Sequence, residues 1–212
     1  SDCINTTFEG YTLACNGSMA NSSKTAFYLY KSDSIGVIQA LYSETVLTDN
    51  DRYRPQNLTV DDAGNIIVLS VNDYQQTDLV LYKFDSQLNL IFKNTIGTDF
   101  ANEVYYNKNT YALATDDNND IYISGSFTGT HTIGSSTISP TLYTYDGFLA
   151  KISSTGVSQW ATIATNDGLI NSNTSSTYLT IDNNIISCFF NYQLKCTKFD
   201  QSGNFITSFQ NN

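Results

Sequence analysis

The sequence predicts an all-β fold, a β-propeller-like array of four four-stranded antiparallel sheets, and two observations carry this prediction. A lysine follows an apolar run four times, at Lys31, Lys83, Lys151 and Lys198. These lysines lie roughly 50 to 70 residues apart, a spacing typical of propellers and other arrays of repeated units. Each one is followed by a short polar turn and then by a further apolar run. The array is expected to be either a small closed propeller or an open, partial one.

The repeats are expected within a single domain, at residues 1–48, 55–98, 110–165 and 176–212. The third repeat shows its strands most clearly. Its apolar runs cover residues 110–115, 121–127, 147–152 and 157–164. The connections between them are rich in Asn, Asp, Gly and Ser, which suit the geometry of hairpins. Each repeat is therefore predicted to form one antiparallel sheet.

The third strand of a repeat is apolar on both of its faces. In the second repeat Val80, Tyr82 and Phe84 share one face, and Leu79 and Leu81 share the other. A sheet with one face in water would alternate between apolar and polar residues, so these strands are expected to be covered on both sides. Radial stacking of similar sheets around an axis achieves this.

Composition and charge exclude several classes of function. The formal charge of −10 and the pI near 4.2 argue against binding to nucleic acid, whose phosphates need Lys and Arg. They also argue against an anionic membrane surface. No apolar run reaches the roughly 18 residues of a membrane span, so no membrane insertion is expected.

Sequons and cysteines favour a secreted or cell-surface location. Five Asn-x-Ser/Thr sequons are candidate glycosylation sites, at Asn5, Asn16, Asn21, Asn57 and Asn173, although a chain rich in Asn, Ser and Thr also produces sequons by chance. The four cysteines allow three connectivities. Hairpin geometry favours Cys3 with Cys15 and Cys188 with Cys196, each pair lying across a turn. The alternative is four free cysteines packed as small apolar side chains.

The third repeat also resembles a known family. The stretch from Asp117 to Thr130, with Tyr145 to Ile152 and Thr155 to Trp160, resembles the β-propeller repeat called the SBBP repeat. The similarity is close over about residues 112–164 and looser over 58–97. The resemblance implies a propeller blade and a large extracellular or cell-surface protein. It brings no catalytic residues with it.

Residues for catalysis, metals or cofactors are scarce, and no site of these kinds is predicted. The one histidine, His131, lies in the 129–145 insertion, and we interpret it as a surface-loop residue. No G-x-S-x-G motif accompanies it. Asp116, Asn118 and Asp120 match only the first half of an EF-hand loop. Similar Asp- and Asn-rich turns recur at the same strand junction, which favours a hairpin turn over a calcium site.

Tyrosines near predicted connections supply the one ligand hypothesis. They are Tyr53, Tyr74, Tyr105, Tyr106, Tyr143 and Tyr145. Tyr beside Asn and Asp suits sugar recognition, while the alternative is that these rings fill the seams between sheets. The main expectation is a non-enzymatic, secreted glycoprotein that acts as a structural or adhesive building block of an extracellular filament or surface layer. The alternative is a lectin-like carbohydrate-binding propeller, with glycans as its partners.

Self-association is expected through the terminal strands. The tail from Gln201 to Asn212 carries no charge, and Phe205, Thr207 and Phe209 alternate with Ile206 and Ser208. Such a strand, with an unguarded edge, is a template for pairing with another strand.

Overall fold

The computed structural model describes ten segments of the chain and confirms the all-β prediction. The described segments are residues 6–8, 11–17, 25–45, 53–72, 78–98, 111–127, 129–140, 146–164, 175–191 and 193–210. All the regular secondary structure within these segments is β-strand, and the strands form four antiparallel sheets. No helix in these segments is long and apolar enough to cross a membrane.

Each sheet takes its strands largely from one repeat, and the strands lie side by side in chain order. The first strand of each sheet is called here its inner strand and the fourth its outer strand. The first sheet holds β1 (Thr6–Phe8), β2 (Tyr11–Gly17), β3 (Thr25–Ser32) and β4 (Ile38–Thr45). The second holds β5 (Tyr53–Val60), β6 (Ile66–Asn72), β7 (Asp78–Phe84) and β8 (Leu90–Gly97). The third holds β9 (Tyr111–Thr115), β10 (Ile121–Phe127), β13 (Asp146–Ile152) and β14 (Ser158–Ile163). The fourth holds β15 (Ser175–Asp182), β16 (Asn184–Asn191), β17 (Gln193–Phe199) and β18 (Phe205–Gln210).

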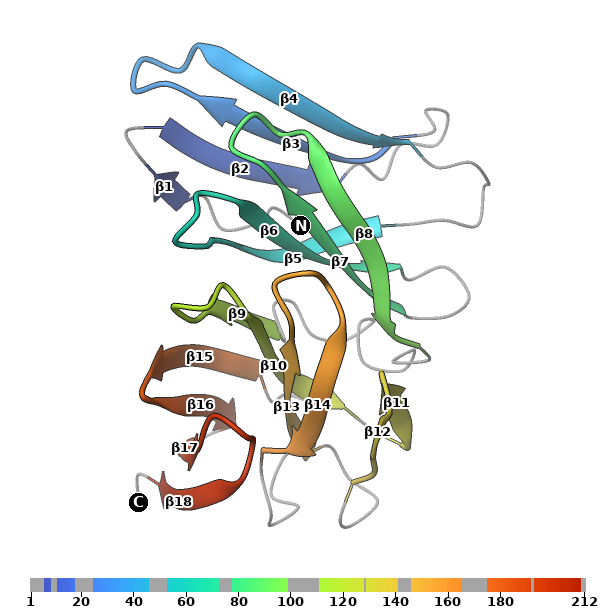
Figure 1. Cartoon of the computed structure of the whole chain (residues 1–212), viewed down its shortest axis with the longest axis vertical. Helices are drawn as coiled ribbons and strands as arrows, with labels where there is room; N and C mark the ends of the chain where they lie inside the picture. Colours follow the sequence, from blue (N-terminus) through green and yellow to red (C-terminus); the bar gives the residue numbers. More distant parts are fainter. Residues whose placement is uncertain are drawn as a thin grey trace.

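The four sheets form an open arc. Consecutive sheets contact one another through their inner strands, β9 lying between β5 and β15. Figure 1 shows the first sheet at the top of the molecule and the fourth at the bottom. Of the two forms that the sequence allows, the structure therefore has the open one.

The second sheet departs from the predicted four strands. The short strands β11 (His131–Ile133) and β12 (Ser136–Ile138) form a hairpin that extends it to six strands. The sequence places these residues in an insertion of the third repeat, but Ile133 pairs with Gly97 at the end of β8. The physical reason is burial, because Ile133 and Ile138 complete the apolar core between the second and third sheets.

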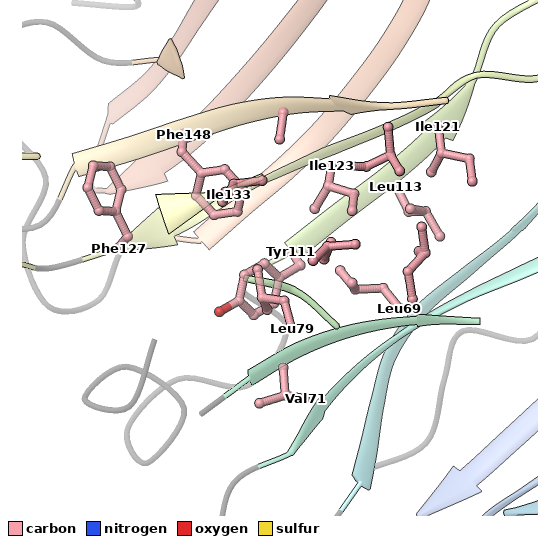
Figure 2. Packing of buried hydrophobic residues seen from close by; sticks show 14 of the residues in the cluster. Leu69, Val71, Leu79, Tyr111, Leu113, Ile121, Ile123, Phe127, Ile133 and Phe148 are labelled. Atoms are coloured by element: carbon pink, nitrogen blue, oxygen red, sulfur yellow. The ribbon is translucent and has the colours of Figure 1, made fainter. Parts of the chain in front are cut away.

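Apolar side chains fill each seam between sheets, as the two-sided pattern of the third strand predicts. The largest cluster lies between the second and third sheets, and Figure 2 shows Leu69 and Leu79 facing Tyr111 and Ile123 across it. A second cluster, around Tyr82 and Phe84, joins the first and second sheets. A third, around Tyr122 and Phe189, joins the third and fourth.

Hairpin turns with aspartate side chains lie along one edge of the arc, called here the turn edge. The carboxylate of Asp61 accepts hydrogen bonds from the amides of Ala63 and Asn65, and Asp116 accepts from Asn118 and Asp120. Equivalent bonds occur at three further turns, those of Asp33, Asp85 and Asp200. No cluster of three or more potential metal ligands occurs in the described segments. The hydrogen bonds to their own turn amides identify these aspartates as turn formers.

The repeated lysines join neighbouring sheets at the turn edge. Lys31 Nζ donates to the Ser86 carbonyl of the next sheet at 3.3 Å, and Lys83 Nζ donates to the Ser154 carbonyl at 3.2 Å. Lys83 also forms a buried ion pair of 2.9 Å with Asp61. We call this contact from a third-strand lysine to the turn of the next sheet the lysine bridge.

The third seam uses a variant of the lysine bridge. Lys151 stays within its own sheet, 3.0 Å from Asp120 and 3.6 Å from Asp116. Its cross-strand partner Tyr122 makes the crossing instead, since its hydroxyl lies 2.7 Å from Oε1 of Gln201 and 3.0 Å from Oδ2 of Asp116 and can donate its one hydrogen to either. Burial raises the pKa of Tyr122 to about 12, so this hydroxyl stays protonated.

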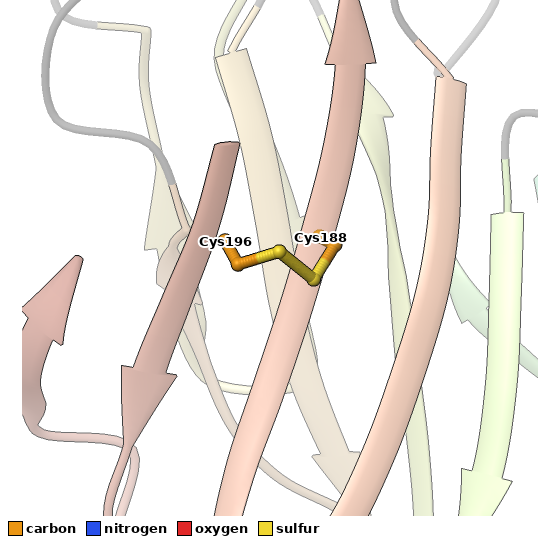
Figure 3. The surroundings of a disulfide bond; sticks show 2 residues. All are labelled: Cys188 and Cys196. Atoms are coloured by element: carbon orange, nitrogen blue, oxygen red, sulfur yellow. A yellow bond between two sulfur atoms is a disulfide. The ribbon is translucent and has the colours of Figure 1, made fainter. Parts of the chain in front are cut away.

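The disulfide Cys188–Cys196 links β16 and β17 of the fourth sheet (Figure 3). The two residues are direct cross-strand partners, with their Cα atoms 4.0 Å apart. This pairing is the one that hairpin geometry predicts. The other predicted pair, Cys3 with Cys15, is not tested, because Cys3 and the side chain of Cys15 lie outside the described residues.

Replacing Lys83 with Met should strongly destabilise the protein. The substitution leaves the fully buried Asp61 carboxylate without its cation, a change that costs about 3–5 kcal/mol. The matched control Lys31→Met removes a half-buried lysine and should cost about 1 kcal/mol. Urea unfolding followed by circular dichroism measures both. Equal losses for the two variants would contradict a special role for the buried pair.

The same pair sets a dependence on acid pH. Burial acts to raise the pKa of Asp61, but the hydrogen bonds from Lys83 and Asn65 outweigh it and hold this pKa below its ordinary value. Its contribution to stability is therefore complete above the unfolded-state pKa of about 4 and is lost as the pH falls through the folded-state value. In the Lys83→Met variant this acid loss should be smaller.

Candidate functional site

The edge opposite the turns, called here the loop edge, is where the longer connections leave the sheets. In the second sheet the turns at 61–65 and 85–89 lie at one end of the strands. At the other end of the strands, β6 ends and β7 begins. The lysine bridges keep successive sheets in the same orientation. Loops at one edge of a rigid scaffold are the usual place for binding residues.

Three acidic residues lie at the loop edge, one from each of three consecutive sheets. Glu44 is next to last in β4, Asp78 begins β7, and Asp146 begins β13. Asp146 is fully buried and Glu44 is 6% exposed, while Asp78 is half-buried. Asp78 and Asp146 hold the same position relative to Lys83 and Lys151. Arg54, at the start of β5, adds a cation to this edge.

Glu44 is at the centre of a polar cluster in the first seam. Tyr42 Oη donates to Glu44 Oε2 at 2.5 Å, and Lys93 Nζ lies 2.5 Å from Oε1. The same ammonium lies 4.1 Å from the ring centre of Tyr53 and 5.4 Å from that of Tyr82. Strands β4, β5, β7 and β8 supply these five residues, which we call the Glu44 cluster.

Burial and charge fix the protonation of the Glu44 cluster. Burial raises the pKa of Tyr42, and its hydrogen bond to Glu44 raises that pKa further. The pKa of Tyr82 is also raised, by burial first and then by the charge of Glu44. Burial lowers the pKa of Lys93, but its contact with Glu44 more than offsets this and leaves the pKa above its ordinary value. The phenols of Tyr42 and Tyr82 are therefore neutral, and Lys93 carries an ammonium on a side chain that is 33% exposed.

A second group of polar residues lies where β10, β11 and β13 meet. Asp146 is the cross-strand partner of Phe127, and the ring of Phe127 contacts the His131 ring at 5.9 Å and the Phe148 ring at 6.1 Å. His131 is only 7% exposed. The interpretation of His131 as a surface-loop residue is therefore wrong, because it lies in a strand and packs against the core.

The sequence carries a signal that finds this hairpin. His131 and Ile133 alternate with Thr132, and Ile138 follows a Gly134-Ser135 turn, which is a short hairpin pattern. Gly134 has a φ of +59°, the left-handed conformation that such a turn needs. The acids of the loop edge lack any comparable signal, since a single Asp or Glu at a strand end is common.

The candidate glycosylation sites are only partly described. Asn16 lies in β2, without a described side chain, and Asn5, Asn21 and Asn173 are outside the described segments. Asn57 is half-buried in β5, where its Nδ2 donates to the Tyr111 carbonyl of the third sheet at 3.1 Å. One hydrogen of this amide is thus used between two sheets. Glycosylation of all five asparagines stays a prediction.

Of the six tyrosines considered for sugar binding, the structure describes Tyr53. Its ring packs edge-on against Tyr82 at 6.3 Å and beneath the ammonium of Lys93, so it fills the seam between the first two sheets. The other five fall outside the described segments: Tyr74, Tyr105, Tyr106, Tyr143 and Tyr145.

Comparison with known proteins shows similarity at the level of the fold. No protein-family model and no curated protein sequence matches the chain, so the SBBP resemblance stays a prediction. A thermostable family-43 glycoside hydrolase is similar with a TM-score of 0.51 at 8% identity, over 98% of this chain and 71% of that one. An endo-arabinase from Bacteroides thetaiotaomicron VPI-5482 gives 0.48 at 11% identity, over 97% and 72%.

A protein of unknown function from Bacteroides caccae is also similar, with a TM-score of 0.49 at 8% identity. The match covers 94% of this chain but 57% of the Bacteroides caccae protein, so the chain spans little more than half of that protein's length.

These comparisons correct two expectations. The sequence favours a non-enzymatic structural or adhesive building block, yet a solved structure that shares the fold over nearly the whole chain is a glycoside hydrolase. The main functional prediction and the prediction that the chain is not an enzyme are both wrong on this ground. The likeness is one of fold, because the identity is 8%.

Replacing Glu44 with Gln should weaken the protein in a pH-dependent way. The change removes a charged acceptor from Tyr42 and Lys93 and should cost about 1–3 kcal/mol near pH 7. The raised pKa of Lys93 means that the contribution of the pair is complete below about pH 10 and is lost as the pH rises through the folded-state value. The gap between wild type and variant should therefore narrow above that pH. Urea unfolding at pH 7 and pH 10.5 measures it, and a gap that stays constant would contradict this account.

Proposed function

We propose that this chain is a carbohydrate-binding propeller that recognises sugars at its loop edge. The observation that carries the proposal is Asp78, a half-buried carboxylate where a strand begins at the loop edge, in a fold shared with a family-43 glycoside hydrolase. Carboxylates accept hydrogen bonds from sugar hydroxyls, and tyrosine rings stack on sugar faces. Lys93 of the Glu44 cluster supplies a cation whose side chain is partly exposed.

The contrast between the two edges supports this placement. At the turn edge the aspartates hold their own turns, and Asp61 also holds Lys83. At the loop edge Asp78 and Asp146 stand at equivalent strand starts, beside the connections to which binding residues usually belong.

The fold supports carbohydrate as the ligand class, since a family-43 glycoside hydrolase shares it. Glycoside hydrolases generally act through a pair of carboxyl groups about 5–9.5 Å apart. Asp78 and Asp146, on neighbouring sheets, are the pair to test for such a role. Binding and hydrolysis are separable, so each is measured on its own.

A secreted location accompanies this proposal. The disulfide Cys188–Cys196 is typical of proteins that fold in oxidising compartments. Extracellular polysaccharides and the glycans of glycoproteins are the carbohydrates that a secreted propeller meets.

A glycan array followed by calorimetry with the best ligand tests the proposal. The variants Asp78→Asn and Asp146→Asn each keep the side-chain shape but remove a carboxylate charge. Asp78→Asn should weaken binding about 10- to 100-fold, and the buried Asp146→Asn should weaken it less. The control Asp62→Asn makes the same chemical change at an exposed position of the turn edge and should leave binding unchanged. Reducing-sugar release from plant and microbial polysaccharides tests hydrolysis separately.

Saturable binding that is lost in the loop-edge variants and kept in Asp62→Asn would support the proposal. Absence of binding to every glycan and polysaccharide offered would refute it. Binding that survives in both loop-edge variants would place the sugar elsewhere on the molecule.

A further inference from the structure

The three seams of the arc repeat the packing of a turn on the outer strand of the preceding sheet, two of them add the lysine bridge, and the first and fourth sheets each carry half of this contact. The contact joins the third and fourth strands of one sheet to the turn that follows the third strand in the next sheet. Two of its parts recur and can be followed along the chain. One is the lysine bridge. The other is the packing of the turn on the outer strand of the preceding sheet, called here the seat of the turn.

The seat of the turn is defined by the fifth residue after each lysine. In the second sheet this residue is Leu88, which is 5% exposed and packs in one cluster with Ala40 and Tyr42 of β4. In the third sheet it is Gly156, where an added Cβ would lie 2.5 Å from Asn94 Nδ2 and 3.0 Å from the Phe92 ring. Each turn thus lies directly on the outer strand of the preceding sheet.

The third seam repeats this arrangement. The equivalent residue of the fourth sheet is Gly203, and a Cβ added there would lie 2.9 to 3.0 Å from the Trp160 ring of β14. Trp160 is the cross-strand partner of Lys151, just as Phe92 is the partner of Lys83. Three consecutive seams therefore share one geometry.

The fourth sheet presents the donor half of this contact on its outward face. Phe199 packs against the third sheet, so its neighbour Lys198 points the other way. Lys198 has no hydrogen bond or ion pair to any residue in the described segments. Its cross-strand partner is Thr207, and Phe209, two residues further along β18, is 54% exposed.

The first sheet presents the acceptor half on its own outward face. Its turn runs from Asp33 to Val37, and the Ser34 carbonyl corresponds to the carbonyls of Ser86 and Ser154. Gly36 corresponds to Gly156, yet a Cβ added there would meet nothing within 4 Å. Leu41 of β4 lies on the face opposite Ala40 and Tyr42 and is 58% exposed.

We propose that the outward face of the fourth sheet binds the outward face of the first sheet of a second copy of this chain. Lys198 donates to the Ser34 carbonyl of the second copy, and the turn around Gly36 of that copy sits on Thr207 and Phe209. The occupant is a second copy because its first sheet carries the acceptor turn and the exposed apolar side chains that match the fourth sheet. The surface continues the geometry of three seams present in the chain.

The contact is head-to-tail, and this gives it a distinctive signature. A dimer joined through one such contact keeps one free first sheet and one free fourth sheet, so mass should continue to rise with concentration. The proposal does not depend on carbohydrate binding, since neither outward face includes the row of loop-edge acids.

Variants that block one face each provide the test. Leu41→Asp blocks the first sheet and Phe209→Asp blocks the fourth, and both residues are more than half exposed, so the fold should tolerate either change. Each variant alone should remain a monomer by size-exclusion chromatography with light scattering. Their equimolar mixture should form a 1:1 heterodimer, because each supplies the face that the other lacks. The intact chain should associate at about 100 µM or below.

The lysines offer a matched pair of controls. Lys198→Met should weaken association about tenfold and leave the melting temperature unchanged, since its partner lies in another copy. Lys31→Met removes a bridge inside the chain, so it should lower the melting temperature and leave association unchanged. An intact chain that stays monomeric throughout would overturn the proposal, and so would association that persists in both face-blocked variants.

Discussion

The arc depends on a polar contact at each seam from one sheet to the turn of the next, made by the third-strand lysine at two seams and by Tyr122 at the third. A lysine ammonium is costly to bury unless several acceptors surround it. Lys83 has acceptors from two sheets, the Asp61 carboxylate of its own sheet and the Ser154 carbonyl of the next. Because Asp61 also forms its own turn, one residue couples the local hairpin to the packing of the sheets. Sheet orientation, turn geometry and seam packing are thereby fixed together.

The ends of such an array differ from its middle. In a repeat protein each unit buries one face against its neighbour, so the terminal units need another source of stability. The fourth sheet carries the disulfide Cys188–Cys196 on its outward face, the same face as Lys198. A covalent link between β16 and β17 stabilises this sheet independently of what packs on its outward face.

The sequence predicts most of the fold because its strongest signals are local. The four lysines, their Asp- and Gly-containing turns and the paired apolar runs all lie within a few residues of one another. The Cys188–Cys196 pair could be predicted for the same reason, since it crosses a single hairpin. The β11–β12 hairpin shows a short alternating pattern, but its place beside β8 could not be predicted, because β8 belongs to another repeat. The burial of His131 depends on that placement.

The candidate site is harder to predict because it is assembled across seams. Glu44 meets Lys93 and Tyr82 only when the first and second sheets pack in register, and nothing near Glu44 in the sequence indicates those partners. The two edges of the arc differ in the same respect. The turn edge uses short-range hydrogen bonds that recur in every repeat, and repetition makes them visible in the sequence. At the loop edge the pattern is incomplete, since Asp78 and Asp146 share one position relative to their lysines, whereas the first and fourth repeats have Ala26 and Gln193 there. Residues that serve recognition on a repeated scaffold must differ from repeat to repeat, because a ligand contacts each position once, and the departures from the repeat are thus where function is to be sought.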